Sequence, residues 1–414
     1  MKGAQGINWN MKKNVRSPKY TIVIPTRNRE EYLAYAIESV LSSDRDDIEL
    51  IVSNNHSMDN SGNYLSTLSD ARLKVVMPST ELPMSLHYEF ALSQATGEWV
   101  TILGDDDAVM PYLFERLDIL TVKYPSVSII SSERAYYFWK GCEDLYGDSV
   151  VFYRGGAGET QRSTKKDLLF ALAGLRSCFD LTQIYTTCVV KTSLVNRVKE
   201  LSGGVFYHSI IPDMYSAVAL SLAEETYLRV EEPLFWTGTS NKSMGRSDRI
   251  YKDSELSACK SKTNTKSDPL KLHGEIPQKL HIQGFGALYL YEALLNCPFS
   301  KGFWKTRQIT MLVHAALLIN ARSVSIARCI DKDKLVSDIY AEIRRNGFSL
   351  YQIKSIIFLI MSLSIVRQFL MIPRRLLRKI RFWIRKDAVI STSREGFNTI
   401  LDASRAVEDV LSKC

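Results

Sequence analysis

The sequence predicts an α/β protein built on a mainly parallel sheet. Two observations indicate this class. Short β-branched runs alternate with amphipathic stretches between residues 20 and 103, which is the pattern of consecutive βαβ units. The last of these runs leads directly into three carboxylates, Asp105, Asp106 and Asp107. Because open α/β sheets bind ligands beyond the carboxyl ends of their strands, we expect a binding site at these residues.

The first predicted strand and helix enclose a loop suited to anions. Tyr20–Ile24 is a β-branched run typical of a buried parallel strand. A helix is expected after it, with Asn28 and Glu31 as its N-cap and capping-box pair. The loop Pro25–Arg29 therefore joins a strand to a helix N-terminus, where backbone N–H groups favour negative charge.

The remaining elements follow in chain order. Strands are expected at Ile48–Ser53, Leu73–Met77 and Glu98–Leu103, and helices at Asp59–Leu68, Pro83–Ala95 and Pro111–Lys123. From residue 126 the alternation is less regular, with strands expected within 126–139, 148–158, 186–190 and 227–236, and helices within 165–175, 193–201 and 210–222. Residues 276–345 have helical periodicity and little glycine, which indicates a helical appendage.

Composition excludes several other classes of protein. The chain has 414 residues, 45% hydrophobic and 24% charged, which is typical of a globular protein of about two to three domains. Its seven cysteines stand singly and form no CxxC pair, so we expect neither a zinc site nor a disulfide framework, and a reducing compartment. No signal-peptide core and no uninterrupted apolar stretch of spanning length is found, so neither secretion nor a transmembrane helix is expected.

The net charge of +8 is a local feature. Arg367–Lys386 holds six arginines and two lysines and no acidic residue, so the rest of the chain is close to neutral. This segment follows the apolar run Ser355–Val366 and interleaves its cations with Leu, Ile, Phe and Trp. Such a segment, 355–386, is typical of a helix that lies on a membrane surface. A buried helix followed by a solvated basic helix is the alternative, and the apolar content disfavours nucleic-acid binding.

Several motifs in order resemble one family. They are TIVIPTRNR, IELIVSNNHSMDNS, ALSQATGEWVTILGDDD and, much later, IPDMYSA. With this order and spacing the chain resembles family 2 glycosyltransferases of the GT-A type, the inverting kind that builds bacterial polysaccharides such as capsule or O-antigen. The resemblance spans residues 20–245, about the first 60% of the chain. It implies a Rossmann-like GT-A nucleotide-sugar domain, with the helical appendage behind it.

The resemblance implies domain bounds as well. We expect a loose leader at 1–18, the glycosyltransferase domain at 19–245 and a linker or mobile loop at 246–275. A helical region at 276–390, which contains the basic membrane-surface segment, and a tail at 391–414 complete the chain.

For the acidic cluster the resemblance implies a Mn²⁺ or Mg²⁺ site that holds the donor's diphosphate. Asp107 is the expected direct metal ligand and Asp105 the second choice, while Asp106 would contact the ribose or a metal-bound water. Gly104 stands where the family often has a first Asp, which leaves the division of roles open. A solvated acidic turn that caps the next helix is the structural alternative.

The other expected site residues lie on four segments. The substrate-binding residues are Pro25, Thr26, Arg27, Asn54 and Asn55, with Ser240 and Ser243 in a loop that would close over the donor. Asn54 and Asn55 replace carboxylates that the family usually has, so the nucleotide base is not predicted. Asp213 aligns with the catalytic base, although an Asp in a first helical turn is also favoured by the helix dipole alone.

The predicted function is the metal-dependent, inverting transfer of a sugar from a nucleotide diphosphate sugar to a hydroxyl of a bacterial surface glycan. The acceptor is expected to be a glycan or a polyprenyl-linked glycan. The enzyme is expected in the cytoplasm, peripheral on the inner face of the cell membrane, with no nucleic-acid partner. The alternatives are a non-catalytic membrane-associated binding protein of the same fold and a nucleotidyltransferase. The latter would normally need a Gly-rich, basic loop that PTRNRE does not provide.

Overall fold

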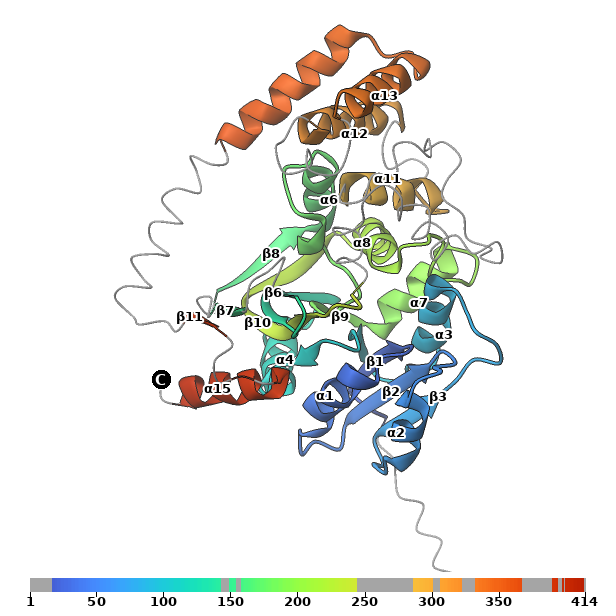
Figure 1. Ribbon diagram of the computed structural model, residues 1–414. Coiled ribbons are helices and arrows are strands. Elements are labelled where there is room, and N and C mark those ends of the chain that lie inside the picture. The colour runs from blue at the N-terminus through green and yellow to red at the C-terminus, as the bar shows by residue number, and fades with distance from the viewer. Residues whose placement is uncertain are drawn as a thin grey trace, which may run out of the picture.

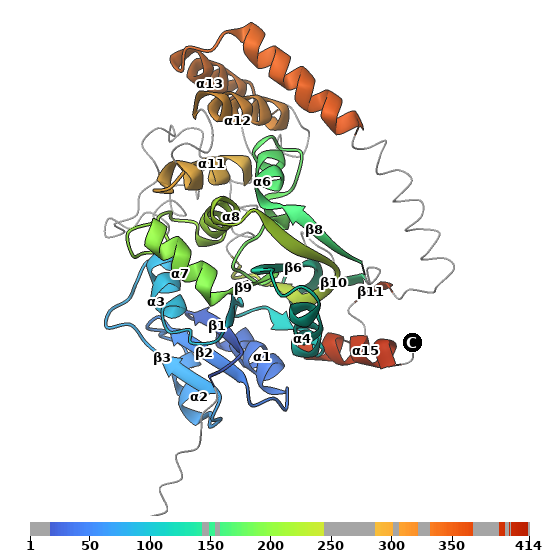
Figure 2. The same cartoon turned by 180° about the vertical axis from the view of Figure 1, so that it is seen from behind.

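The protein is an α/β molecule with one sheet and helices on both of its faces (Figures 1 and 2). The computed structural model describes residues 17–142, 149–153, 158–243, 286–300, 306–321, 332–366, 389–393, 397 and 399–412. The predicted α/β class is confirmed. The leader up to residue 16, Gly245, the linker 246–275 and the basic part of the tail, 367–386, lie outside the described residues.

Four parallel strands form the N-terminal half of the sheet. Their order is β3 (Leu73–Val76), β2 (Ile48–Asn54), β1 (Tyr20–Thr26) and β4 (Trp99–Ile102). The helices between them are α1 (Glu30–Leu41), α2 (Ser61–Thr67) and α3 (Met84–Leu92). Ile22 and Ile24 of β1 pack in the core that contains α1, while Val23 packs in the core that contains α3. The β-branched run is buried on both faces, as expected of a central parallel strand.

The second half of the sheet is mixed. Its strands are β5 (Ala108–Val109), β6 (Ile129–Phe138), β7 (Ser149–Tyr153), β8 (Glu159–Ser163), β9 (Cys188–Lys191) and β10 (Thr226–Thr239). Strand β9 pairs antiparallel with both β4 and β6 and so joins the two halves. Strand β10 runs parallel to β6 and antiparallel to β5 and β8. The end of β10 is thereby placed beside the loop that leaves β4.

One large core ties the helices after residue 110 to the sheet. Besides α4 (Leu113–Lys123), which packs in the other core, these are α6 (Thr164–Leu172), α7 (Thr192–Leu201), α8 (Pro212–Ala223), α11 (Gly286–Asn296), α12 (Thr306–Ala321) and α13 (Lys332–Arg345). In both views α11 to α13 lie at the end of the molecule opposite α2 (Figures 1 and 2).

The C-terminal residues return to the glycosyltransferase-like part of the chain. Strand β11 (Val389–Ser393) pairs antiparallel with β7, and α15 (Ile400–Ser412) packs near α1. Ile400, Ala403 and Val407 of α15 are buried in one cluster with Tyr32 and Trp139. The sequence did not predict this return. One short strand, β11, and one helix, α15, make it, and their sequences do not show which surface they contact.

The expected N-cap of α1 is wrong. Asn28 has a left-handed backbone (φ 56°), and its side-chain oxygen accepts a hydrogen bond from the Met58 amide at 2.7 Å. The helix begins at Glu30, whose amide donates instead to the Asp59 carboxylate at 3.1 Å. The cap therefore comes from the NNHSMD turn that follows β2, a long-range contact that local spacing cannot reveal.

Candidate active site

Three adjacent carboxylates lie in the acid loop, Gly104–Asp107, between β4 and β5. Trp139 Nε1 donates a hydrogen bond to the main-chain oxygen of Asp106 at 2.9 Å and so fixes the loop to the sheet. The carboxylate residues are 9%, 6% and 2% exposed for Asp105, Asp106 and Asp107, yet each has different partners.

Asp107 is held by the protein itself. Its carboxylate accepts hydrogen bonds from the amide of Gly238 at 2.6 Å, from the amide of Gly104 at 3.1 Å and from the Thr186 hydroxyl. Both of its oxygens are therefore used in joining the acid loop to β10 and to Thr186, two residues before β9. This geometry disfavours the expected role of Asp107 as the direct metal ligand and gives it a structural one.

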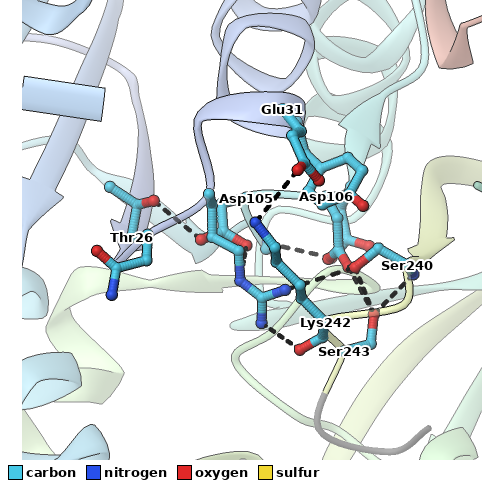
Figure 3. Close-up of polar contacts among 12 residues, drawn as sticks. Thr26, Glu31, Asp105, Asp106, Ser240, Lys242 and Ser243 are labelled. Atoms are coloured by element: carbon cyan, nitrogen blue, oxygen red, sulfur yellow. Dashed lines mark hydrogen bonds and ion pairs between the residues drawn. The ribbon is translucent and has the colours of Figure 1, made fainter. Parts of the chain in front are cut away.

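Asp105 and Asp106 face the open side of the loop (Figure 3). Asp105 accepts a hydrogen bond from the Thr26 hydroxyl at 2.9 Å and lies 3.6 Å from Arg29 Nε. Asp106 accepts hydrogen bonds from the Ser240 and Ser243 hydroxyls at 2.7 and 2.6 Å. Both contacts on Asp106 come from the loop after β10, so movement of that loop would free its carboxylate.

Arg29 is a site residue that the sequence reasoning missed. Besides its ion pair with Asp105, its guanidinium donates to the main-chain oxygen of Lys242 at 2.6 Å (Figure 3). Arg27, which was expected to bind substrate, instead pairs with Glu81 at 2.6 Å and is largely exposed. The two arginines are two positions apart in TRNRE, and only the left-handed turn at Asn28 decides which one faces the carboxylates.

The acid loop carries more negative charge than its surroundings balance. Burial, more than any other cause, raises the pKa of Asp105 and of Asp107 to about 7. The neighbouring Asp106 raises both further, whereas Arg29 lowers that of Asp105. An additional cation would relieve this repulsion. Within the described ranges, no group of three or more His, Cys, Asp or Glu side chains is arranged to hold a metal alone.

Asp213 lies at the first turn of α8, as expected from IPDMYSA, and is half-buried. Burial raises the pKa of its carboxyl group, while its hydrogen bond from the Met214 amide, at 2.9 Å, lowers it. The preceding loop is anchored from the helical appendage, because the Ser209 hydroxyl donates to the buried Glu292 of α11. The appendage thus helps to place Asp213.

Two tyrosines connect Asp213 with the acid loop. The rings of Tyr88 and Tyr185 stack with their centroids 6.5 Å apart. Burial raises the pKa of Tyr88, and the charges of both Asp213 and the acid loop add to this shift, so its hydroxyl is within electrostatic reach of both. The Tyr185 hydroxyl lies 2.6 Å from the point that a Cβ on Gly104 would occupy. The Asp107 carboxylate oxygen lies 2.5 Å from the same point, so there is no room for a larger side chain at Gly104.

The remaining expected residues lie at the same sheet edge but differ in their contacts. Pro25 is buried in β1 opposite Ser53, and Thr26 lies opposite Asn54. Asn54 accepts a hydrogen bond from the Ser57 amide at 3.0 Å. Asn55 uses its amide group on the main chain of Leu82, at 2.7 and 2.9 Å, which favours a structural role over the expected base contact.

Replacing Gly238 by Ala is expected to damage both stability and function. A Cβ there would lie 1.6 Å from the main-chain oxygen of Asp106, so β10 or the acid loop must shift. By analogy with overpacked cores, the free energy of unfolding should fall by about 3 kcal/mol. Gly62→Ala is a matched control, since its Cβ meets only Asn54 at an ordinary 3.6 Å. Equal melting temperatures for the two variants in denaturation scans would contradict this close approach.

The sequence matches a known family over the N-terminal part of the chain. Residues 21–176 match the model described as Glycosyl transferase family 2. A GalNAc(5)-diNAcBac-PP-undecaprenol beta-1,3-glucosyltransferase of Campylobacter jejuni is 34% identical over 96 residues, 22% of this chain and 31% of that protein. Glycosyltransferase GlyG of Streptococcus pneumoniae is 29% identical over 99 residues, 23% of this chain and 33% of that protein. The chain thus spans about a third of the length of these curated relatives.

Solved structures resemble the chain over a longer range but at lower similarity. S. aureus TarS 1–349 in complex with UDP-GlcNAc has a TM-score of 0.46 and 13% identity, over 80% of this chain and 93% of that one. Mannosyltransferase PcManGT of Pyrobaculum calidifontis, in complex with GDP-Man and Mn²⁺, has a TM-score of 0.39 and 15% identity, over 85% and 87% of the two chains. Because both TM-scores are below 0.5, these structures do not strengthen the match of residues 21–176.

Proposed function

We propose, from the confirmed resemblance of residues 21–176 to family 2 glycosyltransferases, that this protein transfers a sugar from a nucleotide diphosphate sugar to an acceptor hydroxyl. The observation that carries the proposal is the acid loop at the end of β4. Its carboxylates lie at the carboxyl edge of a parallel sheet, and the charges of these carboxylates and of Asp213 both act on the Tyr88 hydroxyl. Reaction with inversion at the sugar carbon is part of the proposal.

The residues of the acid loop fit a divalent cation that also binds the donor. Mg²⁺ and Mn²⁺ prefer oxygen ligands, and Mg²⁺ in particular often takes only one or two carboxylates together with substrate phosphates. Asp106 would hold the ion, with Asp105 as the second ligand, because Asp107 is committed to Gly238 and Thr186. Such an ion would stabilise the negative charge that develops on the departing diphosphate.

Arg29 would add a second positive group for the diphosphate. Its side chain is 17% exposed and already bridges Asp105 and the loop after β10. A guanidinium binds phosphate oxygens in two-pronged fashion, so the donor would replace Arg29's present partners. Ser240 and Ser243, which now bond Asp106, would then close over the bound nucleotide.

Asp213 would act as the general base. The acceptor hydroxyl would give its proton to this carboxylate as its oxygen bonds to the sugar carbon and the bond to the diphosphate breaks. A raised pKa suits this role, since a stronger base accepts the proton more readily. Tyr88 and Tyr185, whose pKa values are raised by burial, stay protonated and would donate hydrogen bonds to sugar hydroxyls.

We further propose that the acceptor is a lipid-linked bacterial surface glycan. The support is the name of the Campylobacter jejuni relative, whose acceptor carries an undecaprenyl diphosphate. Because that match covers only 22% of this chain, it supports the class of acceptor and not a particular sugar or linkage.

The rate of transfer should fall as the pH is lowered, and this fall should occur at a pH above the ordinary pKa of an Asp side chain. The base must be deprotonated, and burial raises the pKa of Asp213, so protonation inactivates it earlier than it would an exposed carboxylate. The measurement is kcat against pH at saturating donor and Mn²⁺. An acidic limb at or below the usual Asp pKa of about 4 would contradict this assignment.

A screen of sugar nucleotides tests the proposed function. With Mn²⁺ present, the correct donor should raise the melting temperature by mass action, and it should be consumed when extracted lipid-linked glycans are added. Binding without transfer to any acceptor, and without donor hydrolysis, would favour a non-catalytic nucleotide-sugar-binding protein.

A further inference from the structure

The helix Leu350–Val366 presents an apolar face to solvent. It is the unlabelled orange helix that follows α13 in Figures 1 and 2. Its exposed apolar residues, with their exposed fractions, are Leu350 (46%), Tyr351 (81%), Phe358 (74%), Leu359 (56%), Met361 (51%), Leu363 (43%), Ile365 (52%) and Val366 (53%). Contiguous apolar surface of this kind marks an interaction site more often than an ordinary soluble surface.

Three of the exposed residues form one row along the helix. Phe358, Met361 and Ile365 follow one another at spacings of three and four, which places them in one row. The opposite side is buried, since Ile353 and Ile360 are 1% and 5% exposed and pack with residues of the large core and of α12. The helix is therefore fixed to the protein by one side and leaves an apolar side uncovered.

The charged residues in this stretch of the sequence have a single sign. Lys354 is exposed on the same helix, and no Asp or Glu occurs from Gly347 to Lys386. The six arginines and two lysines of Arg367–Lys386 follow directly in the sequence, although the structure does not describe them. Exposed apolar residues next to a surplus of cations are complementary to an anionic bilayer, which offers acyl chains and negative headgroups together.

Among the described residues, no single helix is long and apolar enough to cross a membrane. Val336–Arg345 and Leu350–Val366 pass that test of length and composition only as a pair, with a bend of 120° between them.

We propose that the exposed apolar face of the helix Leu350–Val366 docks on the surface of an anionic lipid bilayer, peripherally and from the cytoplasmic side. Phe358, Met361 and Ile365 enter the boundary between headgroups and acyl chains, and Lys354 lies among the headgroups. The surface is separate from the acid loop, so this inference does not depend on the proposed transfer reaction.

Co-sedimentation of the full-length protein with lipid vesicles tests the surface. The vesicles are phosphatidylcholine with and without phosphatidylglycerol, and the variants are F358D/I365D and the control I119D/V122D. The control adds the same charge at two exposed apolar positions of α4, which are 56% and 80% exposed. We expect wild type and control to bind the phosphatidylglycerol vesicles equally. The variant F358D/I365D should bind them at least about tenfold more weakly, because its contact with the acyl chains is lost.

Two results would overturn the proposal. The first is equal vesicle binding by F358D/I365D and wild type, or no binding by wild type. The second is a wild-type dimer in light scattering that F358D/I365D lacks, with no vesicle binding by either, since this would make the face a contact between two copies. Unchanged circular dichroism and melting temperature of F358D/I365D, whose substituted side chains are exposed, confirm that folding is intact.

Discussion

Replacing Asp213 by Asn should lower kcat for sugar transfer by about 10²- to 10⁴-fold, the range that a general base contributes. The amide cannot accept the acceptor's proton at neutral pH, yet it has nearly the size of the carboxylate. Its oxygen retains the hydrogen bond from the Met214 amide. Because burial raises the pKa of Asp213, loss of the charge should leave folding stability unchanged or slightly increased.

Glu224→Gln is the matched control for this variant. Glu224 is the C-cap residue of the same helix, α8, and its carboxylate pairs with Arg197 at 3.3 Å. The variant should transfer sugar at close to the wild-type rate. Donor affinity, measured by calorimetry, should be the same in Asp213→Asn and wild type. Full activity of Asp213→Asn would exclude Asp213 as the base.

Replacing Asp106 by Asn should weaken Mn²⁺-dependent donor binding by about a hundredfold. This corresponds to a loss of two or more kcal/mol of binding free energy, as is typical when a buried charge loses its partner. The carboxylate is the most available of the three, because its side-chain partners among the described residues are the hydroxyls of Ser240 and Ser243, which lie on a loop. The measurement is the apparent metal constant and KM for donor, at fixed pH. Stability should change little, since both serines still find an acceptor oxygen on Asn.

Asp107→Asn separates a structural from a ligand role. Three groups donate to Asp107, and an Asn side chain offers only one acceptor oxygen, so one donor of Gly238, Gly104 or Thr186 loses its partner. We therefore expect a lower melting temperature for Asp107→Asn than for Asp106→Asn. The assignment is contradicted if Asp107→Asn abolishes metal dependence at unchanged stability while Asp106→Asn keeps it.

The parallel half of the sheet was predictable because its signal is local. Strands β1, β2 and β4 are largely apolar runs that end at polar turns, and such runs are buried on both faces in parallel sheets, whereas β3 is a short, partly exposed strand. The acid loop followed from the same reasoning, since the carboxyl end of β4 is set by the order of the elements.

The contacts within the site were not predictable, because they join distant segments. Arg29 rather than Arg27 faces the acid loop because Asn28 adopts a left-handed backbone, stabilised by Ser57 and Met58 from the turn after β2. The contact that argues against Asp107 as the metal ligand could not be predicted, because its partner Gly238 lies 131 residues away. The apolar residues Ile400, Ala403 and Val407 of α15 recur at helical spacing, but this spacing does not reveal that they pack beside Tyr32 and Trp139.

The central claim is that the acid loop binds the donor's diphosphate through a divalent cation. Titration calorimetry of UDP and GDP into wild type, Asp213→Asn and Asp106→Asn, each with Mn²⁺ and with EDTA, tests it most directly. We expect one nucleotide to bind wild type and Asp213→Asn only with Mn²⁺, and Asp106→Asn much more weakly. Equal binding in EDTA, or undiminished Mn²⁺-dependent binding by Asp106→Asn, would contradict the claim.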